Sequence, residues 1–431
     1  MSIVQSITSS IVYKILNVIT VFIINIWLSR LAGAEGLGIL SFTIATLSVY
    51  NLVSSLGLDT SITYNIAAKR ISSEKVVSVI AAIVVLQIAV GFLIDQLSHN
   101  FFSYHKTNYF FISMILLISI SLTEKFSALL QGQNLFKPLN AALFFSNLFS
   151  VIVLGVIWSF NFQLPIIWVL KIFIALMFCQ SLSLIILYHS YFPFRFTFSF
   201  LKADEFKIFF GYAMITFITN SVQFMAYRID YWLIAYYLRN ESLLGLYAQA
   251  VKLSQLFWVM PLFLASVIFP VVARNKDCRD KERLLSLIRI MNVINLIGCI
   301  VLFLIADWLM PFLFGTQFAG SSSPFKLLLP GIFLFTNAII ISAYFAGIKK
   351  LKVDMIGSIV CLLTVLILDI ILIPRYGING ASVATTISYF LTTIYFIFFF
   401  VRTTNSSLMD LFLVKKQDFI SITELCKSSK S

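Results

Sequence analysis

Charged residues are scarce in this chain of 431 residues. Only 11% are Asp, Glu, Lys or Arg, whereas 60% are hydrophobic and the mean hydropathy is +0.97. A soluble domain carries about 25% charged residues, so a surface facing water cannot be built from this composition. Helices satisfy their own backbone hydrogen bonds in lipid, and about 20 apolar residues span a bilayer core. The composition predicts an all-α, polytopic membrane protein.

The residues that build most catalytic and metal sites are also few. The five cysteines are scattered without a CxxC pair, and the three histidines have no metal-binding spacing. The sequence contains no G-x-x-x-x-G-K-[ST] phosphate loop and no Asp-x-Asp or G-x-S-x-G motif. These absences exclude ATP hydrolysis through such a loop and argue against an enzyme such as a membrane polysaccharide polymerase. No cofactor and no metal are expected.

Long apolar stretches separated by charged or turn-rich segments predict twelve transmembrane helices. The first has neither a basic region before it nor a small-residue cleavage site after it, so it is expected to be a span rather than a signal peptide. The predicted spans lie near residues 10–31, 37–57, 77–97, 107–131, 138–160, 165–189, 207–238, 243–271, 284–305, 326–348, 354–373 and 378–401.

The positions of the basic residues indicate the orientation of these spans. With both termini in the cytoplasm, 20 of the 31 Lys and Arg residues fall in inner segments and only 5 in outer segments. The other six fall within spans: Lys14, Lys125, Lys171, Arg228, Lys252 and Arg289. Such a bias is typical of cytoplasmic loops. The net charge of +13 therefore calls for no nucleic-acid partner.

Two pairs of similar segments suggest that the chain is built from two halves. "SRLAGAEGLGIL" (29–40) is similar to "YYLRNESLLGLY" (236–247), and "LLQGQNLFKPLNAALF" (129–144) is similar to "YFAGIKKLKVDMIGSI" (344–359). The matches have the same order and the same number of spans between them. We therefore expect an N-terminal lobe at 1–190, a cytoplasmic connector at 191–206, a C-terminal lobe at 207–401, and a cytoplasmic tail at 402–431. The tail is either an amphipathic helix on the inner leaflet or frayed.

Several stretches resemble one family of membrane transporters. They include "LAGAEGLGIL" (31–40), "LGLDTSITYNIAAK" (56–69), "YRIDYWLIAYYLRNESLLGLYAQAVKLSQL" (227–256), "LFGTQFAGSSSPFKLLLPG" (313–331) and "RYGINGASVATTISY" (375–389). In this order they resemble the polysaccharide, or O-antigen, flippases of the multidrug/oligosaccharidyl-lipid/polysaccharide exporter superfamily. The resemblance implies twelve helices in two pseudo-symmetric six-helix lobes, as in MATE-like transporters.

The resemblance also implies a task and partners. The cargo would be an undecaprenyl-diphosphate-linked oligosaccharide, moved from the inner to the outer leaflet of the bacterial plasma membrane. Membrane lipids would be further partners, and a polysaccharide polymerase with its chain-length machinery would act on the product outside. Two-lobed transporters bind substrate between their lobes and expose it to each side in turn.

Cations buried within spans are the candidate substrate-binding residues. A charge at the bilayer centre costs about 2.5–3.5 kcal/mol on insertion scales, whereas a wet lumen holding an anionic ligand would suit Arg228. The resemblance to lipid flippases, whose cavity cations come from helices one, seven and eight, favours Lys14, Arg228 and Lys252. Lys171 is a further candidate. Structural pairing or snorkelling to the interface is the alternative for each, and Arg289 is expected to be interfacial.

Acidic residues within spans are candidates for proton or sodium coupling. Asp230 and Glu124 could serve this role, or each could tie one helix to another. Arg228 and Asp230 are two residues apart, about 200° around a helix, so they cannot face each other. Asp369 is expected at an outer interface. Asn17, Asn25, Asn220 and Gln223 could hydrogen-bond sugar hydroxyls or bond between helices.

A multidrug exporter of the same superfamily is the main alternative function. Such a protein carries organic cations and should favour an acidic, aromatic lumen, whereas the buried charges here are mostly basic. A pure scaffold is a third possibility, against which the buried charges argue.

Overall fold

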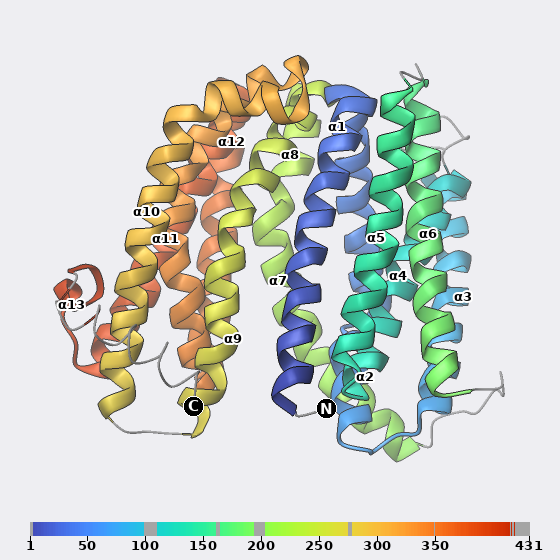
Figure 1. Ribbon diagram of the computed structural model, residues 1–431, viewed down its shortest axis with the longest axis horizontal. Helices are drawn as coiled ribbons and strands as arrows, with labels where there is room; N and C mark the ends of the chain where they lie inside the picture. The colour runs from blue at the N-terminus through green and yellow to red at the C-terminus, as the bar shows by residue number, and fades with distance from the viewer. Residues whose placement is uncertain are drawn as a thin grey trace. The chain divides into compact units, whose positions relative to one another are not determined.

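The computed structural model of the protein describes residues 3–98, 110–160, 164–193, 203–274, 278–348, 350–413, 415 and 418. Within these ranges every regular element is helical (Figure 1). The chain divides into two compact units, Met1–Ser221 and Val222–Ser431. The division falls inside one long helix, α7, which covers Ala203–Leu238. The first part of α7 packs within the N-terminal unit, where Phe209 and Ala213 are fully buried.

The N-terminal unit holds six helices before α7. Helix α1 runs over Ile3–Ser55 but bends at Gly33, whose φ of 67° lies in the left-handed region that glycine tolerates. It is followed by α2 (Leu58–Ala67), α3 (Ser73–Ser98), α4 (Phe110–Gly132), α5 (Phe136–Ser159) and α6 (Ile166–Tyr191). In this unit α1 packs mainly on α5, and α4 on α6 and α2 (Figure 1).

The C-terminal unit continues from the second part of α7. Its elements are α8 (Glu241–Gln255), the 3₁₀ turn η2 (Leu256–Trp258), α9 (Val259–Arg274), α10 (Cys278–Phe314), the 3₁₀ segment η3 (Thr316–Ser321), α11 (Ser322–Gly347), α12 (Leu351–Thr404) and α13 (Leu408–Phe412). Helix α11 packs against α9, α10 and α12 and forms the centre of the unit. Helix α12 bends at Gly377, where φ is 58°.

The predicted membrane-protein class agrees with these helices. Among the described residues, nine helices are long and apolar enough to cross a membrane. Two of them, Val12–Ser55 and Lys352–Thr404, contain the bends at Gly33 and Gly377 and are each long enough for two spans. Many large apolar side chains on the helices are exposed, including Leu304 at 73%, which suits a surface that faces acyl chains. The count of twelve spans stays a prediction.

The two predicted repeats fall at corresponding places in the two units. Gly132 is the last residue of α4, and Gly347 is the last residue of α11. The other pair of similar segments is 29–40 and 236–247. In 236–247, Asn240 caps α8 by accepting a hydrogen bond from the Leu243 N–H at 3.1 Å. The matching segment of the N-terminal unit contains the bend at Gly33. Equivalent sequence positions therefore end or redirect equivalent helices.

The C-terminal tail, which follows α12, forms a buried ion pair with α10 that the sequence did not predict. The expectation that Arg289 is interfacial is wrong, because its side chain is only 1% exposed and donates to both carboxylate oxygens of Asp418. Arg289 also donates to the Asp410 carbonyl at 2.7 Å. Leu411 of α13 is fully buried against the same unit. The tail is thus fastened to α10 as far as Asp418. The apolar cluster at Phe419, Ile420 and Ile422 lies outside the described residues.

The electrostatics of this pair favour the ionised carboxylate. Burial by itself raises the pKa of Asp418, but the hydrogen bonds from Arg289 and from the Lys415 N–H, with the guanidinium charge, outweigh it and lower the pKa to about 2. A lowered pKa in the folded state stabilises the attachment above the ordinary pKa of aspartate. This contribution is lost as the pH falls through about 2, so the tail is attached at neutral pH.

We expect Asp418→Asn to release the tail at neutral pH, because the amide cannot form the charged pair and leaves Arg289 buried without a countercharge. Trypsin should then cleave after Lys415 several-fold faster than in the wild type, measured by mass spectrometry of the intact protein. Asp307→Asn is the matched control, since Asp307 is an exposed carboxylate on α10, the helix that carries Arg289. Equal cleavage of Asp418→Asn and wild type would contradict the fastening role.

Candidate functional site

Two of the predicted cations lie close together in the C-terminal unit. Arg228 of α7 donates to the Gln255 side-chain oxygen at 3.2 Å and to the Tyr231 hydroxyl at 3.0 Å, and its guanidinium lies 5.1 Å from the centre of the Tyr231 ring. Lys252, one turn before Gln255 on α8, is near enough for its charge to interact with that of Arg228. Both side chains are half-buried. The carboxylate of Asp230 is also within reach of the Arg228 charge. The two cations therefore offer an anion a positive place with one carboxylate nearby.

Asp230 lies on the same stretch of α7 and is buried. It accepts a hydrogen bond from the Tyr247 hydroxyl of α8 and one from the Tyr231 N–H at 2.9 Å. The Tyr247 hydroxyl is in turn 3.3 Å from the Thr385 hydroxyl of α12. Asp230 thus joins α7 to α8 and, through Tyr247, to α12. This arrangement is compatible with both roles that the sequence left open, a helix tie and a coupling site.

Asp369 of α12 is an acidic residue that the sequence placed wrongly. It was expected at an outer interface, but it is 0% exposed. Its charge is within reach of both Asp230 and Tyr247. Neither carboxylate oxygen has a hydrogen-bond partner among the described residues. Burying a bare carboxylate is costly, so a proton or a bound cation is needed to offset the charge of Asp369.

The other predicted cations, Lys14 and Lys171, belong to the N-terminal unit. Lys14 on α1 is exposed. Lys171 on α6 is also exposed, and its amino group lies 4.6 Å from the centre of the Trp168 ring. Neither residue is part of a buried charged cluster within its own unit. Their assignment to a substrate lumen stays a prediction.

Glu124 and Lys125 are neighbours on α4 with separate sets of partners. The Asn51 amide of α1 donates to Glu124, which therefore ties α4 to α1. Lys125 is 0% exposed and donates to the hydroxyls of Ser55 at 2.7 Å and Ser121 at 2.8 Å. Its amino group is also 4.0 Å from the Asp59 carboxylate. Polar side chains surround this buried cation and leave no gap in its partners for a ligand.

Among the predicted amide residues, Asn17 and Gln223 have different surroundings. Asn17 of α1 accepts from the Asn147 amide of α5 at 2.6 Å, and Asn147 accepts from Gln180 of α6 at 3.1 Å. Asn17 therefore bonds between helices, which was one of its two expected roles. Gln223 of α7 is exposed and donates to the Tyr227 hydroxyl at 3.3 Å.

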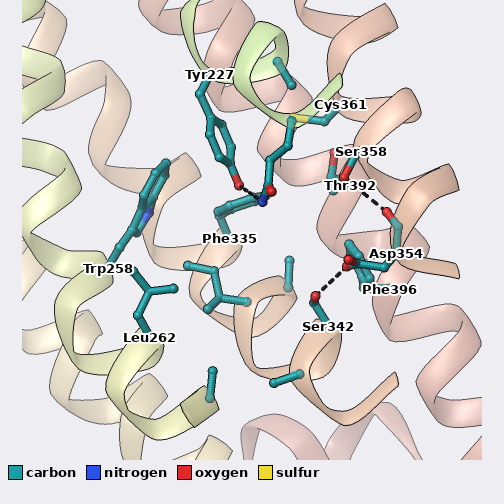
Figure 2. Close-up of a pocket in the computed structure, with 16 residues that line it drawn as sticks. Tyr227, Trp258, Leu262, Phe335, Ser342, Asp354, Ser358, Cys361, Thr392 and Phe396 are labelled. Carbon is teal, nitrogen blue, oxygen red and sulfur yellow. Dashed lines mark hydrogen bonds between the residues drawn. The ribbon is translucent and has the colours of Figure 1, made fainter. Parts of the chain in front are cut away.

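Gln223 and Tyr227 line a cavity of about 300 Å³ within the C-terminal unit (Figure 2). Its walls come from α7, η2, α9, α11 and α12. The largest lining side chains are the aromatic rings of Tyr227, Trp258, Phe335 and Phe396, and Asp354 of α12 is the acidic one. The sequence analysis missed this cavity. With 44 phenylalanines in the chain, aromatic residues gave no signal that singled these out.

The fold described above is that of a multi-pass helical membrane protein. A sequence profile described as polysaccharide biosynthesis protein matches residues 3–276, more than half of the chain. The chain belongs to this polysaccharide biosynthesis protein family. The family agrees with the expectation of a transporter rather than an enzyme and with the predicted resemblance.

A curated relative shares part of this sequence. The chain is 25% identical over 203 residues to the probable low-salt glycan biosynthesis flippase Agl15 of Haloferax volcanii. The match covers 45% of this chain and 42% of the relative, so the chain matches less than half of that protein's length.

Solved structures share the fold along nearly the whole chain. The lipid II flippase MurJ in an inward closed conformation has a TM-score of 0.74 at 15% identity, with 99% of this chain and 93% of that one covered. An inward-facing MATE multidrug transporter has a TM-score of 0.68 at 16% identity, with 92% and 98% covered. A transporter of the same superfamily from Pyrococcus furiosus has a TM-score of 0.61 at 15% identity, with 94% and 97% covered. At these identities the likeness establishes the fold alone.

We expect Lys125→Met to destabilise the protein, because it leaves Glu124 and Asp59 without their nearby positive charge and two serine hydroxyls without their partner. Removing one member of a buried ion pair costs about 3–5 kcal/mol. Thermal unfolding of the detergent-solubilised protein should therefore shift to a lower temperature by several degrees. Lys207→Met, at an exposed position in the same unit, should leave the unfolding temperature unchanged. An unshifted Lys125→Met would show that the network contributes little to stability.

Proposed function

We propose that this protein is a flippase for lipid-linked oligosaccharides. Its substrate would be an undecaprenyl-diphosphate-linked repeat unit, which it moves from the inner to the outer leaflet of a bacterial plasma membrane by alternating access. Both termini would be cytoplasmic. The product would then enter O-antigen or related polysaccharide synthesis, where a polymerase and its chain-length machinery take it up. Family membership supports the class of substrate.

The observation that carries the proposal is the placement of Arg228 beside Lys252. A lipid diphosphate must bring negative charge into an apolar environment, where it needs countercharges and hydrogen-bond donors. A guanidinium offers phosphate two parallel N–H donors, and an ammonium adds a compact positive charge. Gln255 and Tyr231 hold the guanidinium of Arg228 in place. A pre-oriented donor loses less entropy when the ligand binds.

Cations of the N-terminal unit complete the proposed substrate path. Lys14 and Lys171 are exposed side chains on α1 and α6, and each would offer a further countercharge to the diphosphate as it moves. Exposure within their own unit is what this role requires, because an interhelical partner such as those of Lys125 would compete with the ligand.

Ion coupling is proposed at the acidic residues of the C-terminal unit. The chain has no phosphate loop for ATP, so a proton or sodium gradient is the energy source that its side chains could use. Tyr247 contacts both Asp230 and Thr385, and the buried carboxylate of Asp369 interacts electrostatically with Asp230 and Tyr247. A proton or a sodium ion shared by these carboxylates would offset their repulsion. Glu124 is the second candidate, although its hydrogen bond to Asn51 also suits a structural tie.

We expect Arg228→Ala to abolish most of the transport, because it removes the bidentate phosphate donor. Charged hydrogen bonds are worth about 1.5–3 kcal/mol each, which corresponds to a loss of about tenfold or more. The measurement is the sidedness of the lipid-linked glycan in a strain lacking the protein, complemented with each variant. Wild type should return the glycan to the outer leaflet, whereas Arg228→Ala should leave it on the inner leaflet.

Two further variants make this test specific. Arg228→Lys keeps the charge but not the fork of donors, so it should restore transport in part. Arg402→Ala removes an exposed arginine from the same unit and should transport as the wild type does. Wild-type transport by Arg228→Ala would refute its proposed role in binding.

We expect Asp369→Asn to uncouple transport from the ion gradient, because the amide neither ionises nor attracts a cation as a carboxylate does. In proteoliposomes, an imposed proton or sodium gradient should accelerate wild-type transport but not that of Asp369→Asn. Asp307→Asn, which changes an exposed carboxylate of α10, should respond to the gradient as wild type does. If neither gradient accelerates wild-type transport, the coupling proposal is refuted. If Glu124→Gln loses the response to the gradient and Asp369→Asn keeps it, the coupling site is Glu124 in the N-terminal unit.

A further inference from the structure

The aromatic cavity of the C-terminal unit has walls made of ring faces and edges. The centre of the Trp258 ring lies 5.3 Å from that of Tyr227 and 5.5 Å from that of Phe335, and the Tyr227 and Phe335 rings meet at right angles. Trp258 is only 9% exposed and Phe335 6%. The rings hold one another in place, so they form a preformed surface rather than a set of mobile side chains.

Polar groups stand at a few places on these apolar walls. In Figure 2, Asp354 and Trp258 lie on opposite sides of the cavity. One carboxylate oxygen of Asp354 accepts from the Ser342 hydroxyl, and the other has no donor among the described residues. Asp354 belongs to the first turn of α12, where the helix dipole favours a negative charge. The Tyr227 hydroxyl accepts from Gln223, which leaves its proton available to an acceptor.

We propose that this cavity binds one sugar ring of the lipid-linked glycan. The inference rests on the proposed flippase function and adds to it the place where the glycan is recognised. The polarised C–H bonds of a sugar ring can lie against the electron-rich faces of aromatic rings. Its hydroxyls can donate to Asp354 and accept from Tyr227. A few polar groups on mostly apolar walls are typical of small-ligand sites, and about 300 Å³ is the lower end of their size range.

Other ligands use the lining groups less well. An acyl or isoprenoid chain would cover the Asp354 carboxylate without giving it a donor, at a cost for the buried charge. An organic cation would suit Asp354 but offers no oxygen to the Tyr227 hydroxyl. A polyhydroxyl ring supplies donors and acceptors together.

The cavity lies next to the proposed phosphate site along α7. Gln223 and Tyr227 line it, and Arg228 is the following residue. A second, smaller pocket shares Ala226 and Tyr227 with the cavity and reaches Gln255, the partner of Arg228. In a lipid-linked glycan the diphosphate is bonded directly to the first sugar. The order of the two sites along the helix therefore matches the order of the two chemical groups in the ligand.

The test compares two lipids that differ only in the sugar. The full-length protein in nanodiscs is titrated with undecaprenyl diphosphate and with the undecaprenyl-diphosphate-linked glycan purified from the host, and both dissociation constants are measured. Wild type should bind the glycan-bearing lipid at least tenfold more tightly. Asp354→Asn and Trp258→Phe should each reduce this preference at least fivefold while still binding the lipid without sugar, which also reports that they are folded.

The controls separate failure of this inference from failure of the function. Asp307→Asn and Trp308→Phe change exposed residues of the same unit and should keep the full preference. Arg228→Ala should weaken binding of both lipids. If wild type binds neither lipid, the flippase proposal fails. If wild type prefers the glycan-bearing lipid and both cavity variants keep that preference, the flippase proposal stands and the sugar site is refuted.

Discussion

The cost of a charge in an apolar environment is the constraint on which this structure depends. Only 11% of the residues of this chain are charged, and several of these charges are buried among the helices. Two of the buried cations are held by specific neighbours. Arg289 has the carboxylate of Asp418, and Lys125 has two serine hydroxyls and, at 4.0 Å, the carboxylate of Asp59. Such partners offset the loss of hydration, and they determine which helix faces meet.

The same constraint separates structural charges from those available to a ligand. Arg289 of α10 and Lys125 of α4 have acidic or hydroxyl partners close by, so an anion would gain little by approaching them. Arg228 is held by an uncharged amide and a tyrosine hydroxyl, and its charge is within reach of both Lys252 and the carboxylate of Asp230. Its hydrogen-bond partners are thus uncharged, unlike those of Arg289. Asp369 is a buried negative charge that calls for a proton or a cation.

Sequence analysis could predict what depends on composition and on local order. The apolar composition predicted the helical membrane fold, and the paired segments predicted that Gly132 and Gly347 would occupy equivalent positions at helix ends. It could not predict partners that are distant in the chain. Arg289 meets Asp418 across 129 positions, and nothing near either residue indicates the other. The sequence around Asp369 likewise does not indicate that its side chain is fully buried by other helices in the folded chain. The aromatic cavity depends on five elements at once.

Substrate selection would depend on two kinds of recognition next to α7, one of the diphosphate and one of the sugar. Charge at Arg228 and Lys252 would recognise a diphosphate, a group common to lipid carriers of this type, and would not distinguish one glycan from another. The aromatic rings and Asp354 would contact the sugar attached to that diphosphate, and their selectivity would depend on where hydroxyls project from its ring. A substitution in the cavity could therefore change the preferred sugar while the phosphate site stays intact. Because α7 contributes Tyr227 to the cavity and Arg228 to the phosphate site, movement of α7 during transport would affect the contacts of both parts of the ligand.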